Sequence, residues 1–209
     1  MNKRLMRQVV GLALALSTSI SHAILITVDP DDFIDGANIS NAYSGITLSA
    51  IDGGSNVIAT SSVFSQTSLL ASTGTQVFGH DGIFVETWAN GLLGDLRIDF
   101  IQATDFVSID IIANDGFDPG FLQAYNSAGT LLDSFTTQGG LGAGIPETAI
   151  ISTASANISY VIASGVSGND VALDNLTYNS ATVPEPATLA LLSFGLLGLG
   201  IARRKKYNN

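Results

Sequence analysis

The stretch Leu96-Arg97-Ile98-Asp99-Phe100 alternates apolar and polar residues, and residues 107–112, Val-Ser-Ile-Asp-Ile-Ile, largely repeat the pattern. A period of two places successive side chains on opposite faces of an extended chain, so each stretch predicts a strand with one buried face. Other short apolar runs separated by turn residues are 24–28, 46–51, 57–59, 83–85, 121–125, 131–135, 149–152 and 158–163. They predict an all-β domain, an antiparallel β-sandwich or jelly roll of about ten strands.

Three details refine this prediction. In 158–163, Ile158, Tyr160 and Ile162 alternate with Ser159, Val161 and Ala163. Leu173 and Leu176 have opposite parity, so burying both requires a bulge around Asp174 and Asn175. Residues 61–72 are the one stretch of this domain in which a short helix is expected.

Residues 183–209 have three parts: Val183-Pro184-Glu185-Pro186, an uncharged apolar run over 187–202, and the basic residues 203–206. The prolines fix φ and remove backbone donors, so the first part is expected to be extended. At about 1.5 Å per residue the apolar run gives roughly 24 Å of helix, a marginal membrane span. The basic residues would hold the C-terminus in the cytoplasm.

This tail resembles the PEP-CTERM sorting signal of exported Gram-negative bacterial proteins. The resemblance rests on Val183, Pro184, Glu185 and Pro186, on a transmembrane helix over 187–202, and on Arg203 and Arg204. It implies recognition by an exosortase, a membrane enzyme that removes the tail. The protein would then be anchored transiently in the inner membrane before it reaches the cell surface or the exopolysaccharide matrix of a biofilm.

The N-terminus is typical of a signal peptide. A basic region (3–7) precedes a short apolar core (9–16), and a small-x-small site ends at Ala23. The apolar core is too short to span a membrane, so we expect export by the Sec machinery and cleavage after Ala23. The predicted organisation is a signal peptide over 1–23, a β-sandwich ectodomain over 24–182 and the sorting signal over 183–209.

The predicted ectodomain is strongly acidic. Of the 18 acidic residues in the chain only Glu185 lies outside it, whereas Arg97 is its one basic residue, which gives a formal charge of −16. Such a surface repels nucleic acid, because binding phosphates requires Lys or Arg. The chain has no cysteine, so disulfides do not stabilise the fold, and a domain of this length can bury a sufficient core without them.

No catalytic residue is predicted, and we expect a protein that is not an enzyme. The ectodomain has neither cysteine nor lysine, and His80 is its only histidine. The setting Gly79-His80-Asp81-Gly82 predicts a surface turn rather than a Ser/His/Asp arrangement. Zinc hydrolysis would need more His or Cys ligands. A carboxylate pair for glycoside hydrolysis stays open among the acidic residues, although no pair stands out.

Three short pieces resemble the β-sandwich ectodomains that often accompany this sorting signal: 43–48, 122–125 with Gly129 and Leu131, and 173–178. The last of them resembles the closing strand of galactose-binding-like jelly rolls and carbohydrate-binding modules. In those folds a structural calcium often joins the first and last strands. Here that would implicate Asp29 or Asp31 together with Asp174, because calcium prefers several hard oxygen ligands. The alternative is that these carboxylates only solvate turns.

The sequence leaves three functions open. The first is a non-enzymatic protein of the cell surface or extracellular matrix. The second is a carbohydrate-binding module with Trp88, Phe117 and Tyr125 as rings that stack on sugars, although each ring could equally belong to the core. A neutral glycan suits the acidic surface best. The third is a hydrolase.

Overall fold

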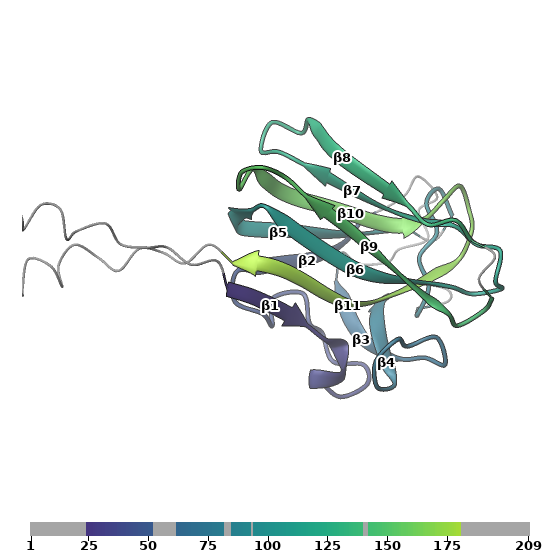
Figure 1. The fold of residues 1–209 in the computed structure, drawn as a ribbon. Coiled ribbons are helices and arrows are strands. Elements are labelled where there is room, and N and C mark those ends of the chain that lie inside the picture. Colours follow the sequence, from purple (N-terminus) through teal and green to yellow (C-terminus); the bar gives the residue numbers. More distant parts are fainter. Residues whose placement is uncertain (1–23, 52–61, 82–84, 93, 140–141, 181–209) are drawn as a thin grey trace, which may run out of the picture. The chain divides into compact units, whose positions relative to one another are not determined.

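A computed structural model of the chain describes residues 24–51, 62–81, 85–92, 94–139 and 142–180 (Figure 1). These residues form one short 3-10 helix, η1 (Pro30–Asp32), and a series of strands. The strands are β1 (Ile24–Val28), β2 (Ile46–Ile51), β3 (Val63–Thr67), β4 (Gln76–His80), β5 (Asp95–Thr104), β6 (Phe106–Ala113), β7 (Gly120–Tyr125), β8 (Leu131–Thr136), β9 (Pro146–Ser152), β10 (Ile158–Gly165) and β11 (Val171–Ser180).

The strands form a four-stranded sheet in the order β1-β11-β6-β9 and a five-stranded sheet in the order β2-β5-β10-β7-β8. A separate hairpin pairs β3 with β4. Every strand pair is antiparallel. The predicted all-β class is confirmed, and the chain passes repeatedly between the two larger sheets, as in a β-sandwich (Figure 1).

One apolar core lies between the two larger sheets. Alternate residues of β5 and β6, such as Leu96, Ile98, Val107 and Ile109, are fully buried in it. Each such side chain contributes about 1.5–3 kcal/mol to the free energy of unfolding. The alternation that predicted these two strands therefore also determines which of their faces forms the core.

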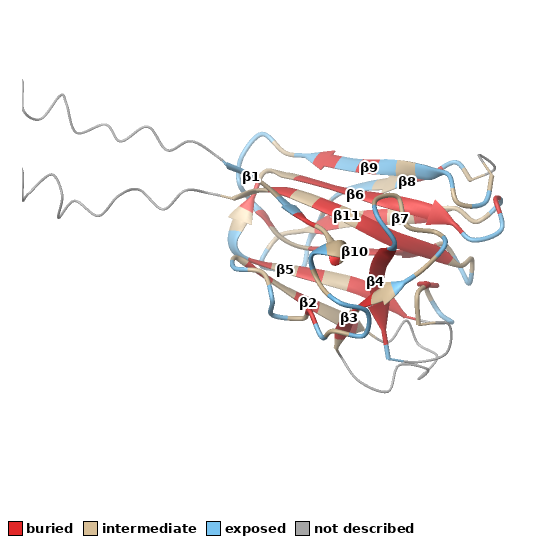
Figure 2. Cartoon of the chain, turned by 90° about the horizontal axis from the view of Figure 1, so that it is seen from below, coloured by how far each residue is buried: buried red, intermediate tan, exposed pale blue. Residues whose placement is uncertain are grey.

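The β3–β4 hairpin and the loop 68–75, which joins its strands, contribute a second apolar cluster. Val77 of β4 is fully buried with Ile112 of β6 and Ala172 of β11, and Leu70 and Ala71 of the loop pack against them. Figure 2 shows β4 buried, whereas much of β8 and β9 is exposed. The hairpin thus covers part of the outer face of the four-stranded sheet.

The helix expected within 61–72 is wrong, because residues 63–67 form strand β3. Their burial alternates and they pair with β4, from Val63 opposite His80 to Thr67 opposite Gln76. Tertiary pairing therefore decides the structure of this Ser- and Thr-rich stretch. Neither β3 nor β4 is among the apolar runs from which strands were predicted.

The first and last strands of the domain are neighbours. Ile24 at the start of β1 pairs with Ser180 at the end of β11. The predicted signal peptide (1–23) and the whole predicted sorting signal (183–209), including its transmembrane helix (187–202), lie outside the described residues. In the part of the chain that is described, no helix is long and apolar enough to cross a membrane.

The predicted bulge in β11 is confirmed. The register with β6 shifts between Asp174 and Thr177, and Asn175 has a positive φ of 50°. As a result Leu173 and Leu176 are both fully buried despite their opposite parity. Asparagine tolerates this left-handed conformation better than most residues, because its short polar side chain bonds locally.

We predict that Asn175→Val destabilises the domain more than Asn175→Gly. Both variants lose the hydrogen bond from Asn175 Nδ2 to Asp110 Oδ2 (3.2 Å), but only glycine adopts the left-handed conformation without strain. The difference in the free energy of unfolding should be at least about 1 kcal/mol. Urea unfolding of the two variants measures it, and equal stabilities would contradict the argument.

Candidate functional site

Two groups of polar side chains in the described structure are candidate binding sites. The acidic cluster consists of Asp29, Asp110 and Asp174 with the hydroxyls of Ser72 and Thr73. The second place is the tyrosine row on the five-stranded sheet, defined as Arg97, Tyr160 and Tyr125. The predicted calcium ligand Asp174 lies in the first of these places, and the predicted glycan-stacking ring Tyr125 lies in the second.

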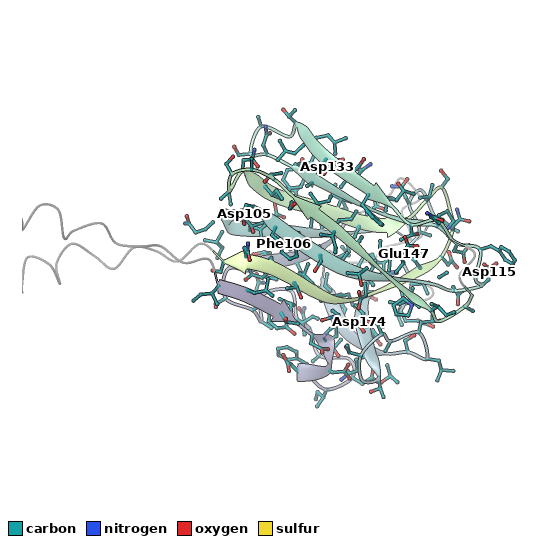
Figure 3. All side chains as sticks on the ribbon, viewed as in Figure 1. Asp105, Phe106, Asp115, Asp133, Glu147 and Asp174 are labelled. Carbon is teal, nitrogen blue, oxygen red and sulfur yellow. The ribbon has the colours of Figure 1, made fainter. Side chains whose placement is uncertain are left out.

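Asp110 of β6 and Asp174 of β11 lie directly opposite each other in the four-stranded sheet. Their exposed fractions are 7% and 0%, because the loop 68–75 covers them. Figure 3 shows Asp174 on β11, close in this view to β3 and β4. Two carboxylates that face each other across a ladder repel, so this pairing needs compensation.

Backbone and hydroxyl donors provide that compensation. Oδ2 of Asp174 accepts hydrogen bonds from the backbone N–H groups of Ser72 (2.9 Å) and Thr73 (3.0 Å). Its Oδ1 accepts one from the N–H of Asn175 (2.7 Å). Ser72 Oγ lies 2.9 Å from Oδ2 of both Asp110 and Asp174. The loop 68–75 is therefore held on the sheet mainly by one buried carboxylate.

The surroundings of Asp174 act on its pKa in two directions. Burial, the largest effect, raises the pKa, whereas the hydrogen bonds from Thr73, Ser72 and Asn175 lower it, with a net rise. Because its pKa is raised in the folded state, Asp174 stabilises the fold at pH values below the ordinary pKa of an aspartate. That contribution is lost as the pH rises through the folded-state pKa. At neutral pH the buried charge thus weakens the fold.

The two other predicted calcium ligands lie at the start of η1. Asp29 caps this helix: its Oδ1 accepts a hydrogen bond from Asp31 N (2.9 Å), and its Oδ2 accepts one from Thr73 Oγ1 (3.2 Å). Thr73 Oγ1 also lies 3.3 Å from Asp174 Oδ2, so one hydroxyl connects Asp29 with Asp174. Asp31 instead accepts from Thr75 N (2.9 Å).

The described residues contain no group of three or more acidic or histidine side chains placed to hold a metal ion. Calcium at Asp174 would have to replace N–H donors that already bind both of its oxygens. Calcium binding by Asp29, Asp31 and Asp174 therefore stays a prediction. Sequence reasoning missed Asp110, because only the register between β6 and β11 brings it opposite Asp174.

The tyrosine row crosses three neighbouring strands on the outer face of the five-stranded sheet. Arg97 lies on β5, Tyr160 on β10 and Tyr125 on β7, and the two tyrosines face each other in the ladder. The Arg97 guanidinium lies 3.8 Å from the centre of the Tyr160 ring. The two tyrosine rings are parallel within 8°, with centroids 4.9 Å apart. Both faces of Tyr160 are therefore covered, whereas Tyr125 has one neighbouring ring.

Hydrogen bonds fix the ends of this row. Arg97 donates to both carboxylate oxygens of Asp99, at 2.8 and 2.6 Å, and the two side chains are 32% and 39% exposed. Hydrogen bonding by Asp99 is the main reason that the pKa of Arg97 is raised. The Tyr125 hydroxyl donates to Gln123 Oε1 (2.6 Å). The result is a preorganised, partly exposed surface of polar and aromatic groups.

The three rings proposed to stack on sugars have different positions. Trp88 is fully buried, and its Nε1 donates to the Phe78 carbonyl (2.7 Å), so it is a core residue with no face open to a sugar. Phe117 is 80% exposed between β6 and β7. Tyr125 is partly exposed in the tyrosine row. Tyr160 was missed, because a register shift after Ile158 turns it outward.

The prediction that His80 lies in a surface turn is wrong. His80 ends β4 and is fully buried. Its Nε2 lies 2.8 Å from the Thr87 carbonyl, and its ring packs against the Trp88 ring with centroids 4.8 Å apart. Gly79 permits this packing, because a Cβ there would lie 2.7 Å from the Val85 carbonyl oxygen. The His80 ring is thus a core side chain rather than a base that activates a nucleophile.

We predict that calcium, if it binds at Asp174, stabilises the native protein by mass action. A hundredfold excess over Kd adds about 2.7 kcal/mol, which raises the melting temperature by roughly 5–10 °C for a domain of this size. Asp174→Ala should abolish the gain. Magnesium should do much less, because it demands stricter octahedral geometry.

Thermal melts of the full-length chain in chelator, calcium and magnesium at equal ionic strength measure these shifts. Asp133→Ala is the matched control, because Asp133 is exposed on β8, away from Asp174 (Figure 3). Equal shifts with both metals, or an unchanged calcium response of Asp174→Ala, would show charge screening without a site. In that case Asp174 acts only as an acceptor for the loop.

Comparison with known proteins adds one firm assignment. Among solved structures the chain is similar to an adhesin domain of Lys-gingipain (Kgp), at 15% identity over 75% of this chain and 98% of that chain, with a TM-score of 0.47. It is also similar to the family 29 carbohydrate-binding module CBM29_1 from Piromyces equi, at 8% identity over 76% and 91%, with a TM-score of 0.41. No curated protein matches. The model of the PEP-CTERM protein-sorting motif matches residues 182–206, so the chain carries this sorting motif at its C-terminus.

Proposed function

We propose that this chain is an exported protein of the cell surface or extracellular matrix whose β-sandwich domain acts without catalysis. The observation that carries the proposal is the sorting motif at 182–206, which begins two residues after β11 ends at Ser180. Ile24, the residue after the expected signal cleavage site, pairs with Ser180, the last residue of β11 before the motif. Both processing segments therefore join the domain at one end of the β1–β11 ladder.

The proposed route has three steps. The Sec machinery exports the chain and the leader is removed after Ala23. The helix 187–202 then anchors the protein transiently in the inner membrane of a Gram-negative bacterium, where an exosortase recognises Val183-Pro184-Glu185-Pro186 and removes the tail. The released domain stays at the surface or enters the exopolysaccharide. Its 17 acidic residues disfavour nucleic acid as a partner.

We predict that replacing Pro184 and Pro186 with alanine leaves the protein in the inner membrane. The prolines make the motif extended and stiff, and alanine lets the following helix extend through it. Cell fractionation followed by immunoblotting measures the distribution. Pro146→Ala is the control, because Pro146 is exposed at the start of β9, outside the motif. Normal release of the double variant would contradict the sorting role.

The positions of the polar groups support the absence of catalysis. In the described part of the chain, His80 is buried in the core and Arg97 is engaged by Asp99. Asp110 and Asp174 face each other, but the loop 68–75 covers them and its donors bind their oxygens. A substrate cannot reach this pair in the closed structure. The hydrolase alternative therefore has the least support.

Binding of a neutral glycan is the second candidate, and the tyrosine row favours it. Arg97, Asp99 and the Tyr125 hydroxyl present donors and acceptors that are already held in place. A sugar would contact ring edges and the open face of Tyr125, since Arg97 and Tyr125 cover both faces of Tyr160. The formal charge of −16 on the predicted ectodomain would repel an acidic polysaccharide.

We predict that Tyr125→Ala and Tyr160→Ala each weaken glycan binding about tenfold, which corresponds to about 1.4 kcal/mol of lost contact. Affinity electrophoresis through neutral and acidic polysaccharides measures the retardation. Phe117→Ala is the control, because it removes an exposed ring outside the tyrosine row. Unretarded migration of the native protein in every neutral polysaccharide, or equal retardation of all variants, would exclude this row as the binding surface.

A further inference from the structure

His80 and Trp88 meet where the β3–β4 hairpin joins the sandwich. Trp88 binds β11 through two backbone hydrogen bonds with Val171, at 2.7 and 3.1 Å. Its indole N–H reaches back to the carbonyl of Phe78 on β4 (2.7 Å). The His80 ring packs edge-on against the indole at 4.8 Å. These two rings therefore fasten β4 to the sandwich.

The hydrogen bonds of His80 determine its charge state. The Thr87 carbonyl can only accept, so Nε2, 2.8 Å away, carries the hydrogen. Nδ1 is buried, and among the described residues it has no hydrogen-bond partner. Adding a proton at Nδ1 would therefore create a buried charge, which is costly.

The surrounding groups do not remove that cost. Burial is the largest effect on the ring; hydrogen bonding to the backbone of Thr87 and of Asp81, and then the carboxylates of Asp81 and Glu86, favour its charged form. Burial outweighs them, so the pKa of His80 is lowered from its ordinary value near 6.5. Opposite His80 on β3 is Val63, and Val171 of β11 lies behind Trp88; neither carries a charge.

We propose that His80 is an acid-sensitive contact. While its ring is neutral it holds the β3–β4 hairpin on the sandwich, and when the ring is protonated it releases the hairpin. Because the folded-state pKa is lowered, the contribution of His80 is fully present above about pH 6.5 and is lost as the pH falls below it. Aspartates and glutamates with ordinary pKa values stay ionised through the start of this window. Release would expose the apolar cluster of Val77, Ile112 and Ala172.

The chain contains a direct fluorescent probe of this His80 contact. Trp88 is its only tryptophan, and His22 is its only other histidine. We would purify the full-length chain in detergent and titrate it from pH 8 to 4.5, following tryptophan fluorescence and far-UV circular dichroism. A charged imidazole beside an indole, or entry of water, changes the emission. The expected result is a fluorescence change with a midpoint below pH 6.5 while the strand signal persists.

Two variants identify the group responsible. His80→Gln keeps an N–H donor for the Thr87 carbonyl but cannot ionise, so it should show no fluorescence transition in this range. His22→Gln should behave as the native chain. Urea unfolding should show the native chain losing stability relative to His80→Gln between pH 7 and 5. Each unit by which the folded-state pKa lies below 6.5 lowers the folded-to-unfolded ratio up to tenfold.

Three results would overturn the proposal: the same transition in His80→Gln, a midpoint at or above pH 6.5, or a fluorescence change that occurs only with loss of the strand signal. If His80→Gln does not fold, the imidazole of His80 can be titrated by NMR in the His22→Gln background. A single histidine resonance in a β-sheet protein that titrates below 6.5 supports the proposal. One that titrates at or above 6.5 contradicts it.

Discussion

The pairing of β11 with both β1 and β6 is the interaction on which the rest of this structure depends. β11 lies between these two strands, and Trp88 bonds to its first residue, Val171. Its bulge turns Leu173 and Leu176 to the same core, while Asp174 points to the other face and holds the loop 68–75. Removing this strand would leave β1 without its partner in the sheet and would remove the main anchor of the loop 68–75.

The charge distribution explains how a domain with 17 acidic residues and one basic residue remains folded. In the described part of the chain, the salt bridge that forms is Arg97–Asp99, and it is partly exposed, so it adds little stability. The buried carboxylates of Asp110 and Asp174 accept hydrogen bonds from the loop 68–75, which offset part of the cost of burying their charge. Stability must therefore come mainly from the apolar core, which needs no disulfides at this chain length.

His80 and Asp174 respond to pH with opposite signs. Burial disfavours the charged form of both groups, so it lowers the pKa of His80 and raises that of Asp174. Mild acid therefore weakens the contact of His80 with Trp88 while it relieves the charge on Asp174. The two groups fasten neighbouring parts of one unit, the β3–β4 hairpin and its loop. Protonating Asp174 removes the cost of its buried charge, but it also weakens the hydrogen bonds that this carboxylate accepts from the loop.

The sequence predicted those features that depend on local periodicity. The alternation in β5 and β6 identified both strands and the face of each that enters the main core, and the parity of Leu173 and Leu176 revealed the bulge in β11. The prediction of a single buried face is wrong for β6, because the β3–β4 hairpin and the loop 68–75 bury its other face as well. Features that depend on register could not be found in this way. The shift after Ile158 turns Tyr160 outward, and only the alignment of β6 with β11 places Asp110 opposite Asp174. His80 was misplaced because its burial depends on β3 and Trp88, which no local pattern connects.

The order of the strands also limits when the four-stranded sheet can be completed during folding. Among the described strands β1 is the first, yet its only partner there is β11, the last. A chain that crosses a membrane unfolded from its N-terminus cannot complete this sheet until residues 171–180 have emerged. Contacts this distant in sequence form slowly, because the closure entropy must be overcome first. The sorting motif begins two residues after β11, so on the proposed export route the strand that completes the sandwich emerges just before the motif.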